Sequence, residues 1–214
     1  SAMQHWTIVL LCAVFAFSAW AQRSPNVIII LTDDQGYNDL SCYGSPDIKT
    51  PRLDKLASEG MRFTDFYASA QVCSPSRAGL LTGCYPQRVG LGRIPAERTK
   101  HPFEHVFYSR SKYGLNTNEV TIAQILKTKG YATGCVGKWH LGDATEFLPT
   151  HRGFDEYYGM PYSNDSKPDC IIRGDKVIEE HTNQDTLVER YTDEATKFIR
   201  AHKDGPFFLY FAHN

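Results

Sequence analysis

The sequence has no excess of charge of either sign, because its 23 lysine and arginine residues are balanced by 24 aspartate and glutamate residues. A balanced chain has no general attraction to nucleic acid or to an anionic membrane, so any anion chemistry must come from a local cluster. The sequence also lacks an internal repeat, and its 16 glycines and 11 prolines are too few for a fibrous protein. Apolar residues make up 42% of the chain, which excludes disorder and suffices for one ordinary domain or two very small ones.

A hydrophobic run long enough to cross a bilayer is also missing. A spanning helix needs about 20 apolar residues, and the run IVLLCAVFAF covers only residues 8–17. Ala19 and Ala21 follow it and fit the small-residue rule for signal cleavage, although no lysine or arginine precedes the run. We expect a signal peptide over residues 1–21, starting with a two-residue cloning remnant; a hydrophobic first helix is the alternative. Cleavage before Gln22 implies export to a periplasmic, secreted or lysosomal-type compartment, with no stable membrane anchor afterwards.

Cysteine is scarce and shows no spacing typical of a metal site. Six cysteines are present, and Cys12 would leave with the signal peptide. An oxidising compartment favours disulfide pairing, and the odd number that remains leaves at least one thiol unpaired. The pairing among Cys42, Cys84, Cys135 and Cys170 cannot be read from the sequence.

Apolar, strand-like runs alternate with helical stretches along the rest of the chain. The first run, NVIIILT (residues 26–32), is continuously apolar and rich in β-branched residues, which is typical of a strand buried on both faces. The order of the elements predicts an α/β sandwich, with helices flanking a central mixed, largely parallel sheet. Further strands are predicted over residues 61–67, 131–136 and 206–211, and helices over residues 50–60, 76–82, 118–129 and 184–203.

Two stretches do not fit this alternation. Residues 91–116 are rich in histidine, arginine and tyrosine without a clear period, which predicts a surface excursion near a site. The predicted strand at residues 206–211 ends the sequence with no helix after it to cover its face. We therefore expect the chain to be the first part of a larger domain, with this strand as an uncovered, aggregation-prone edge.

Asp33 and Asp34 follow the first predicted strand directly. In open α/β sheets, sites lie at the carboxyl ends of strands. Two adjacent carboxylates repel each other unless a cation lies between them, and their oxygens suit hard ions such as Ca²⁺ or Mg²⁺. The alternative is a turn with two solvated acids.

Cys73 begins the stretch CSPSR (residues 73–77), in which proline and serine predict the start of a helix. The backbone N–H groups and the dipole at a helix N-terminus favour anions, and Arg77 adds a cation one turn further on. A cysteine placed there would be a good nucleophile; a buried cysteine beside a structural arginine is the alternative. Lys138 and His140 follow the strand predicted at residues 131–136 and could supply a charge and a proton carrier, or could be structural only.

Together these stretches resemble the type I sulfatases, the formylglycine-dependent family. The matching segments are CSPSRAGLLTG (residues 73–83) and GYATGCVGKWHLG (residues 130–142), together with residues 33–36, 47–52 and 62–67. Residues 153–155 and 161–165 resemble the branch of arylsulfatase A and N-acetylgalactosamine-6-sulfatase. The resemblance extends over residues 25–214, so residues 22–214 are interpreted as the N-terminal part of a sulfatase catalytic domain.

The resemblance implies an alkaline-phosphatase-like fold, incomplete in this chain, and the hydrolysis of sulfate monoesters. It implies that a maturation enzyme converts Cys73 to Cα-formylglycine, which Arg77 would hold. Ca²⁺, or alternatively Mg²⁺, would bind Asp33, Asp34 and the modified Cys73. Lys138 would hold the sulfate oxygens, His140 would accept a proton from the hydrated aldehyde, and Ser163 would lie near the sulfate.

Family features that are absent from this sequence limit the resemblance. A second metal-binding pair, a second lysine and a second active-site histidine are not in the sequence, and His213 has the wrong register to replace that histidine. This segment alone is therefore expected to be inactive. The alternatives are a phosphoester or phosphonate hydrolase of the same fold and a truncated, non-catalytic binding module. The substrate stays open among sulfated sugars, sulfated glycolipids and aryl sulfates.

Overall fold

The computed structural model describes residues 24–92 and 106–214. The predicted signal peptide and residues 93–105 of the predicted surface excursion lie outside these ranges. Within the described ranges, none of the helices combines the length and the apolar character that a membrane crossing requires.

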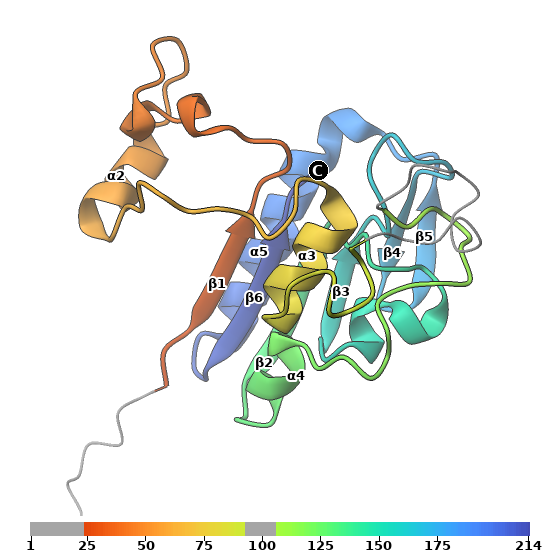
Figure 1. Cartoon of the computed structure of the whole chain (residues 1–214). Coiled ribbons are helices and arrows are strands. Elements are labelled where there is room, and N and C mark those ends of the chain that lie inside the picture. The colour runs from red at the N-terminus through yellow and green to blue at the C-terminus, as the bar shows by residue number, and fades with distance from the viewer. Residues whose placement is uncertain (1–23, 93–105) are drawn as a thin grey trace, which may run out of the picture.

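A single six-stranded sheet forms the centre of the molecule, with the strand order β1-β6-β2-β3-β4-β5 (Figure 1). The pairs β1–β6, β6–β2 and β2–β3 are parallel, and the pairs β3–β4 and β4–β5 are antiparallel. The mixed, largely parallel sheet expected from the sequence is thus confirmed. Its strands are β1 (Val27–Leu31), β2 (Ala132–Gly137), β3 (Glu156–Gly159), β4 (Cys170–Arg173), β5 (Lys176–Glu180) and β6 (Phe207–Ala212).

Helices cover both faces of the sheet, as the alternation of side chains along β6 shows. Phe208 and Tyr210 pack in one core cluster with residues of α3 (Cys73–Thr82) and α4 (Ile122–Lys127). Phe207 and Leu209 point to the other face and pack with α5 (Leu187–His202). Successive strand residues face opposite sides, so the central strand is buried by both layers. Short 3₁₀ helices occupy Tyr37–Asp39, Ser41–Tyr43, Thr145–Phe147, Pro149–His151 and Gln184–Thr186.

The predicted helices all form, with shifted ends. The second begins at Cys73 rather than residue 76, and Gly83 ends it in a left-handed conformation. The third is shorter than predicted because Thr121 caps its start, accepting a hydrogen bond from the backbone of Gln124. The first, α2 (Pro51–Glu59), buries none of its residues and belongs to an excursion that stands off the sheet (Figure 1).

The strand predicted over residues 61–67 does not exist. These residues have no neighbouring strand to pair with. Hydrogen bonds from side chains replace the backbone hydrogen bonds that a neighbouring strand would provide. The Tyr37 hydroxyl accepts a hydrogen bond from the backbone N–H of Phe66 at 2.9 Å. The Tyr43 hydroxyl donates to the carbonyl oxygen of Phe63 at 2.7 Å.

The prediction that the strand at residues 206–211 is an uncovered edge is also wrong. β6 is not an edge, because it lies between β1 and β2 and packs against α5. The edge strands are instead β1 and β5. The prediction that the first strand is buried on both faces is wrong as well, since Ile28 and Ile30 of β1 are 45% and 54% exposed.

Strands β3, β4 and β5 were not predicted. The signal for the β4–β5 hairpin is present, since Gly174 and Asp175 form a two-residue turn between two apolar stretches. β3 is only four residues long, with two tyrosines, and gives no clear period.

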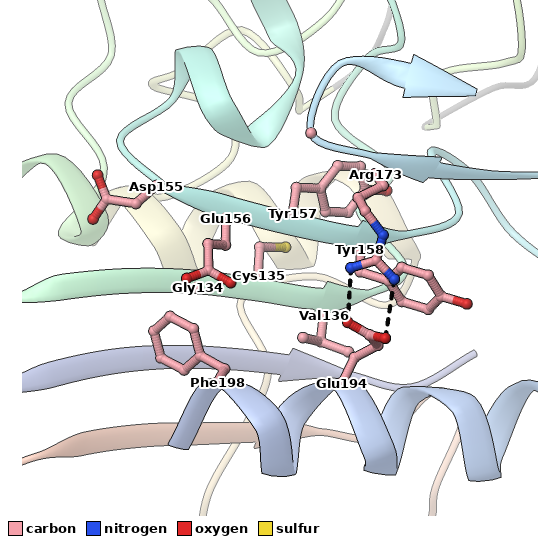
Figure 2. Close-up of a pocket in the computed structure, with 11 residues that line it drawn as sticks. Gly134, Cys135, Val136, Asp155, Glu156, Tyr157, Tyr158, Arg173, Glu194 and Phe198 are labelled. Atoms are coloured by element: carbon pink, nitrogen blue, oxygen red, sulfur yellow. Dashed lines mark hydrogen bonds and ion pairs between the residues drawn. The ribbon is translucent and has the colours of Figure 1, made fainter. Parts of the chain in front are cut away.

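Figure 2 shows a pocket of about 320 Å³ between α5 and strands β2 to β4. Arg173 crosses it and donates two hydrogen bonds to Glu194, at 2.8 and 3.0 Å. The guanidinium carbon also lies 4.6 Å from the centre of the Tyr158 ring. These hydrogen bonds outweigh the effect of burial and lower the pKa of Glu194 to about 2. The pair therefore ties the hairpin to α5.

The Arg173–Glu194 pair should make stability depend on pH. Because the pKa of Glu194 is lowered on folding, its contribution is complete above the unfolded value of 4.5 and is lost as the pH falls towards 2. At pH 7 we expect Glu194→Gln to cost about 1 kcal/mol, a value reduced for solvent screening. Urea unfolding of both proteins from pH 7 to pH 2.5 measures the difference, which should shrink below about pH 4.5. A difference that is constant over this range would contradict the assignment, and Glu189→Gln on the exposed side of α5 is the control.

Candidate active site

The candidate residues meet because three parallel strands end at the same edge of the sheet. Asp33 and Asp34 follow β1 after a single residue, Thr32, and Lys138 comes directly after β2. β6 lies between these strands and aligns Leu31 and Gly137 with the same residue, Ala212. The carboxyl ends of β1 and β2 are therefore held at the same level.

Asp33 is at the centre of the site. Its carboxylate accepts a hydrogen bond from Lys138 Nζ at 2.5 Å and one from Arg77 Nη2 at 3.2 Å. Burial would raise the pKa of Asp33, but the hydrogen bond and charge of Lys138 and the charge of Arg77 hold it below the usual value. Lys138 and Arg77 are each only 1% exposed, so the ionised carboxylate compensates two buried cations.

Arg77 is fixed by further contacts under the start of α3. Its Nη1 donates to the carbonyl oxygen of Lys138 at 2.7 Å and to the Tyr210 hydroxyl at 3.3 Å. Cys73 begins the same helix, and its Sγ lies 3.3 Å from Lys138 Nζ. The helix thus places a half-buried thiol and a buried guanidinium around one lysine.

Ser74 joins three segments beside the site, and it was not predicted from the sequence. Its Oγ donates to the carbonyl oxygen of His140 at 2.8 Å and accepts from the backbone N–H of Phe107 at 3.0 Å. Both partners are backbone atoms far away in sequence, so no local pattern could have identified this role.

His140 is buried and neutral. Burial, together with the nearby charge of Lys138, lowers its pKa to about 3. Its Nε2 lies 3.0 Å from the carbonyl oxygen of Phe107, which can only accept, so Nε2 carries the proton. Nδ1 is then unprotonated, and it is buried without a hydrogen-bond partner among the described residues. Its lone pair therefore accepts no hydrogen bond in the part of the chain that the structure describes.

The loop that carries Lys138 and His140 is fixed by its backbone. Gly137 has φ +104°, and a Cβ there would lie 1.7 Å from the carbonyl oxygen of Ala212. That same oxygen accepts the backbone N–H of Lys138 at 2.8 Å. The backbone N–H of His140 donates to Pro161 at 2.9 Å. The close approach to β6 therefore requires glycine at position 137.

A cleft of about 940 Å³ opens over these residues. Arg77 lies beneath its lining, and residues 106 and 108–113 contribute to its wall, so part of the predicted excursion lies at the site. The predicted site residues on the lining are Asp33, Asp34, Cys73, Lys138, His140 and Ser163. His213 is not among the lining residues and packs its ring 4.4 Å from that of Phe211.

The cleft offers oxygen ligands that suit a hard cation, but only a few of them. Asp33 and Asp34 offer carboxylate oxygens, and Asp34 is exposed, with φ 53°. Among the described residues, no group of three or more histidine, cysteine, aspartate or glutamate side chains is placed to hold a metal. In this structure the charge of Asp33 is met by Lys138 and Arg77 instead.

The cysteines of the described ranges are all free, contrary to the pairing favoured for an exported chain. Cys135 and Cys170 are buried in β2 and β4. Burial raises the pKa of both of these thiols.

The fold and the cleft define an α/β protein with a charged site at the carboxyl ends of its parallel strands. Comparison with known proteins narrows this class, since residues 25–214 match the family model described as Sulfatase. Human arylsulfatase A is 48% identical over 161 residues, covering 74% of this chain and 29% of that protein. N-acetylgalactosamine-6-sulfatase of Rattus norvegicus is 37% identical over 228 residues, covering 98% of this chain and 43% of that protein.

Solved structures agree with this match. A Bacteroides thetaiotaomicron protein described with the metabolism of multiple glycosaminoglycans has a TM-score of 0.78 at 28% identity, covering 90% of this chain and 51% of that one. A protein solved with its substrate D-glucosamine-2-N,6-O-disulfate has a TM-score of 0.66 at 29% identity, covering 89% of this chain and 34% of that one. The chain belongs to the sulfatase family, and its fold is the expected alkaline-phosphatase-like sandwich. It spans 29% and 43% of the two curated relatives.

Replacing Gly137 should be far more damaging than replacing another left-handed glycine. Gly44 has nearly the same φ, +100°, but nothing lies within 4 Å of a Cβ built there. Gly44→Ala should cost about 1–2 kcal/mol from backbone strain alone. Gly137→Ala should cost at least about 2 kcal/mol more, because β6 must also move away. Urea unfolding compares the two variants, and equal costs would show that the contact with Ala212 is not constrained.

His140 should keep one protonation state over the physiological range. With a pKa of about 3, its ring should stay neutral from pH 5 to 8 with the proton on Nε2. Nitrogen-15 NMR of histidine-labelled protein reports both the charge and the tautomer. A free histidine side chain, which titrates near pH 6.5, is the reference. Titration of His140 between pH 6 and 7, or a proton on Nδ1, would contradict this assignment.

Proposed function

We propose that the protein containing these residues hydrolyses sulfate monoesters, with residue 73 as the nucleophilic position. The observation that carries the proposal is the meeting of Cys73 Sγ, Lys138 Nζ and the Asp33 carboxylate, at 3.3 and 2.5 Å, in a chain of the sulfatase family. The family implies a formylglycine made from the cysteine, and a maturation enzyme would carry out that conversion of Cys73. When present, the hydrated aldehyde would supply the attacking oxygen.

Two buried cations would stabilise the negative charge that develops during the reaction. Lys138 lies next to residue 73 and would hold the sulfate oxygens as negative charge builds up on them. Arg77 has three fixed partners beneath the site and would keep residue 73 and Lys138 in place. Because both side chains are held before substrate binds, little reorganisation would accompany the reaction.

His140 would accept the proton of the attacking hydroxyl group. Its ring is neutral and Nδ1 has an unshared lone pair. With a pKa of about 3 it is a weak base before substrate binds, so this role requires the negative charge of the bound sulfate to raise that pKa. The ring of Tyr162 packs against it edge-on at 5.4 Å, which would hold its orientation. Ser163, the next residue along, lines the same cleft and would contact the bound sulfate.

Asp33, Asp34 and the modified Cys73 would hold a divalent cation, Ca²⁺ or alternatively Mg²⁺. When bound, the ion would supply positive charge for the nucleophile and the sulfate. The hard oxygen donors at the cleft support this assignment. Asp33 would then exchange part of its present contact with Lys138 and Arg77 for the ion.

The substrate is proposed to be a sulfated saccharide, with sulfated glycolipids and aryl sulfates as the other candidates. A similar solved protein binds a sulfated glucosamine, and the cleft is large enough for a ligand of that size. We further propose that the protein is exported after cleavage of the predicted signal peptide.

The nucleophile is tested by mass spectrometry and by substitution in the full-length protein. We expect the peptide containing Cys73 to carry the mass of formylglycine. Cys73→Ala should lower the turnover of an aryl sulfate at least about 10³-fold without loss of folding, because the side chain is small. Cys84→Ala, at the other end of α3, is the matched control and should keep normal turnover.

Parallel assays decide the reaction class. Turnover of sulfate monoesters in preference to matched phosphate monoesters supports the proposal, and the reverse preference would assign a phosphoester hydrolase instead. No turnover of either ester by the correctly modified, full-length protein would favour a binding module.

A further inference from the structure

The cleft lining carries cations that the reaction centre does not use, together with two carboxylates, Asp34 and Asp165, outside the Asp33 cluster. Lys138 and Arg77 are already paired with Asp33. Two further cations, Arg110 and Lys112, lie on the cleft lining in the segment YSRSKY (residues 108–113). In the part of the chain that the structure describes, neither of them forms an ion pair with a carboxylate. Lys167, also on the lining, differs because it pairs with Asp169 at 3.0 Å.

The backbone of this segment is held in an unfavourable conformation. Arg110 has φ 62°, in the left-handed region that residues with a Cβ seldom adopt. Its backbone N–H donates to Asp143 Oδ2 at 2.7 Å, and Asp143 Oδ1 accepts from the Tyr162 hydroxyl at 3.1 Å. One carboxylate thus fixes both Arg110 and the tyrosine that packs against His140. Strain held in place by surrounding contacts is common at binding sites.

A neighbouring group in the same segment lacks a partner. Ser109 Oγ is buried and has no hydrogen bond within the described ranges, although the residue lines the cleft. A buried hydroxyl without a partner is costly, and it could donate a hydrogen bond to an acidic group of a ligand. Arg110 and Lys112 could hold the same group by charge-assisted hydrogen bonds.

We propose that Arg110 and Lys112, with Ser109, form a second anion subsite, so that the preferred substrate is a sulfated saccharide carrying a second acidic group. The proposal rests on the sulfatase function proposed above and adds its substrate class. A cleft of about 940 Å³ has room for a saccharide whose second sulfate or carboxylate lies away from the reacting one. Arg110 suits either group because its planar guanidinium can bind both in a bidentate manner.

The test uses the full-length, modified enzyme and three saccharides with the same reacting sulfate. One has no other charge, one has a second sulfate, and one has a carboxylate in place of the second sulfate. We expect kcat/KM to be at least about tenfold higher for one or both of the dianionic saccharides, and the better of the two identifies the second group. The difference should lie mainly in KM.

Arg110→Asn combined with Lys112→Gln removes both charges, and asparagine tolerates the left-handed backbone at position 110. We expect this double variant to lose the preference while keeping its kcat/KM for the singly charged saccharide. Lys167→Gln, which removes a paired cation of the same cleft, should keep the preference. An unchanged preference in the double variant, or no preference in the unmodified sequence, would overturn the proposal.

Binding to the full-length Cys73→Ala protein separates this proposal from the catalytic one. Calorimetry should show tighter binding of a dianionic than of the singly charged saccharide, and the double variant should lose that difference. This result would stand even if no sulfate ester were turned over. Equal affinities would overturn the second subsite while leaving sulfatase activity intact.

Discussion

The site depends on the compensation of two buried cations by one carboxylate. Lys138 and Arg77 have almost no contact with water, and Asp33 is the acid that both of them reach. Removing one partner of such a buried group leaves an uncompensated charge, which is among the most destabilising changes a protein can undergo. Because the three residues come from β1, β2 and α3, their charges also fix how these elements fit together. The same contacts hold the cleft floor in position.

Much of this centre could be predicted because its residues directly follow or begin regular elements. Continuous apolar runs identified β1 and β2, which placed Asp33 and Lys138 at carboxyl ends of strands. Proline and serine identified the start of α3 and so the position of Cys73. The supporting residues could not be predicted. Ser74 and Asp143 act on backbone groups more than 30 residues away, and no local pattern encodes such contacts.

The errors in the predicted sheet have a related cause. Residues 61–67 alternate like a strand, but a strand exists only where a neighbour offers a ladder of hydrogen bonds. β4 and β5 have such neighbours in β3 and in each other. The Gly174–Asp175 turn marks their hairpin in the sequence, whereas the pairing of β4 with β3 depends on the rest of the fold. Sequence patterns thus located elements better than they identified the neighbours of each strand.

The central position of β6 determines when the parallel part of the sheet can form during synthesis. β1 and β2 make no ladder with each other, because β6 lies between them. Residues 208–212 pair with residues 27–31, which lie almost the whole described chain earlier. During synthesis, β1 must therefore wait until residues 208–212 have been made before its ladder can form. Such distant pairing is slow to form, so the reaction centre is completed late, when the central strand enters the sheet.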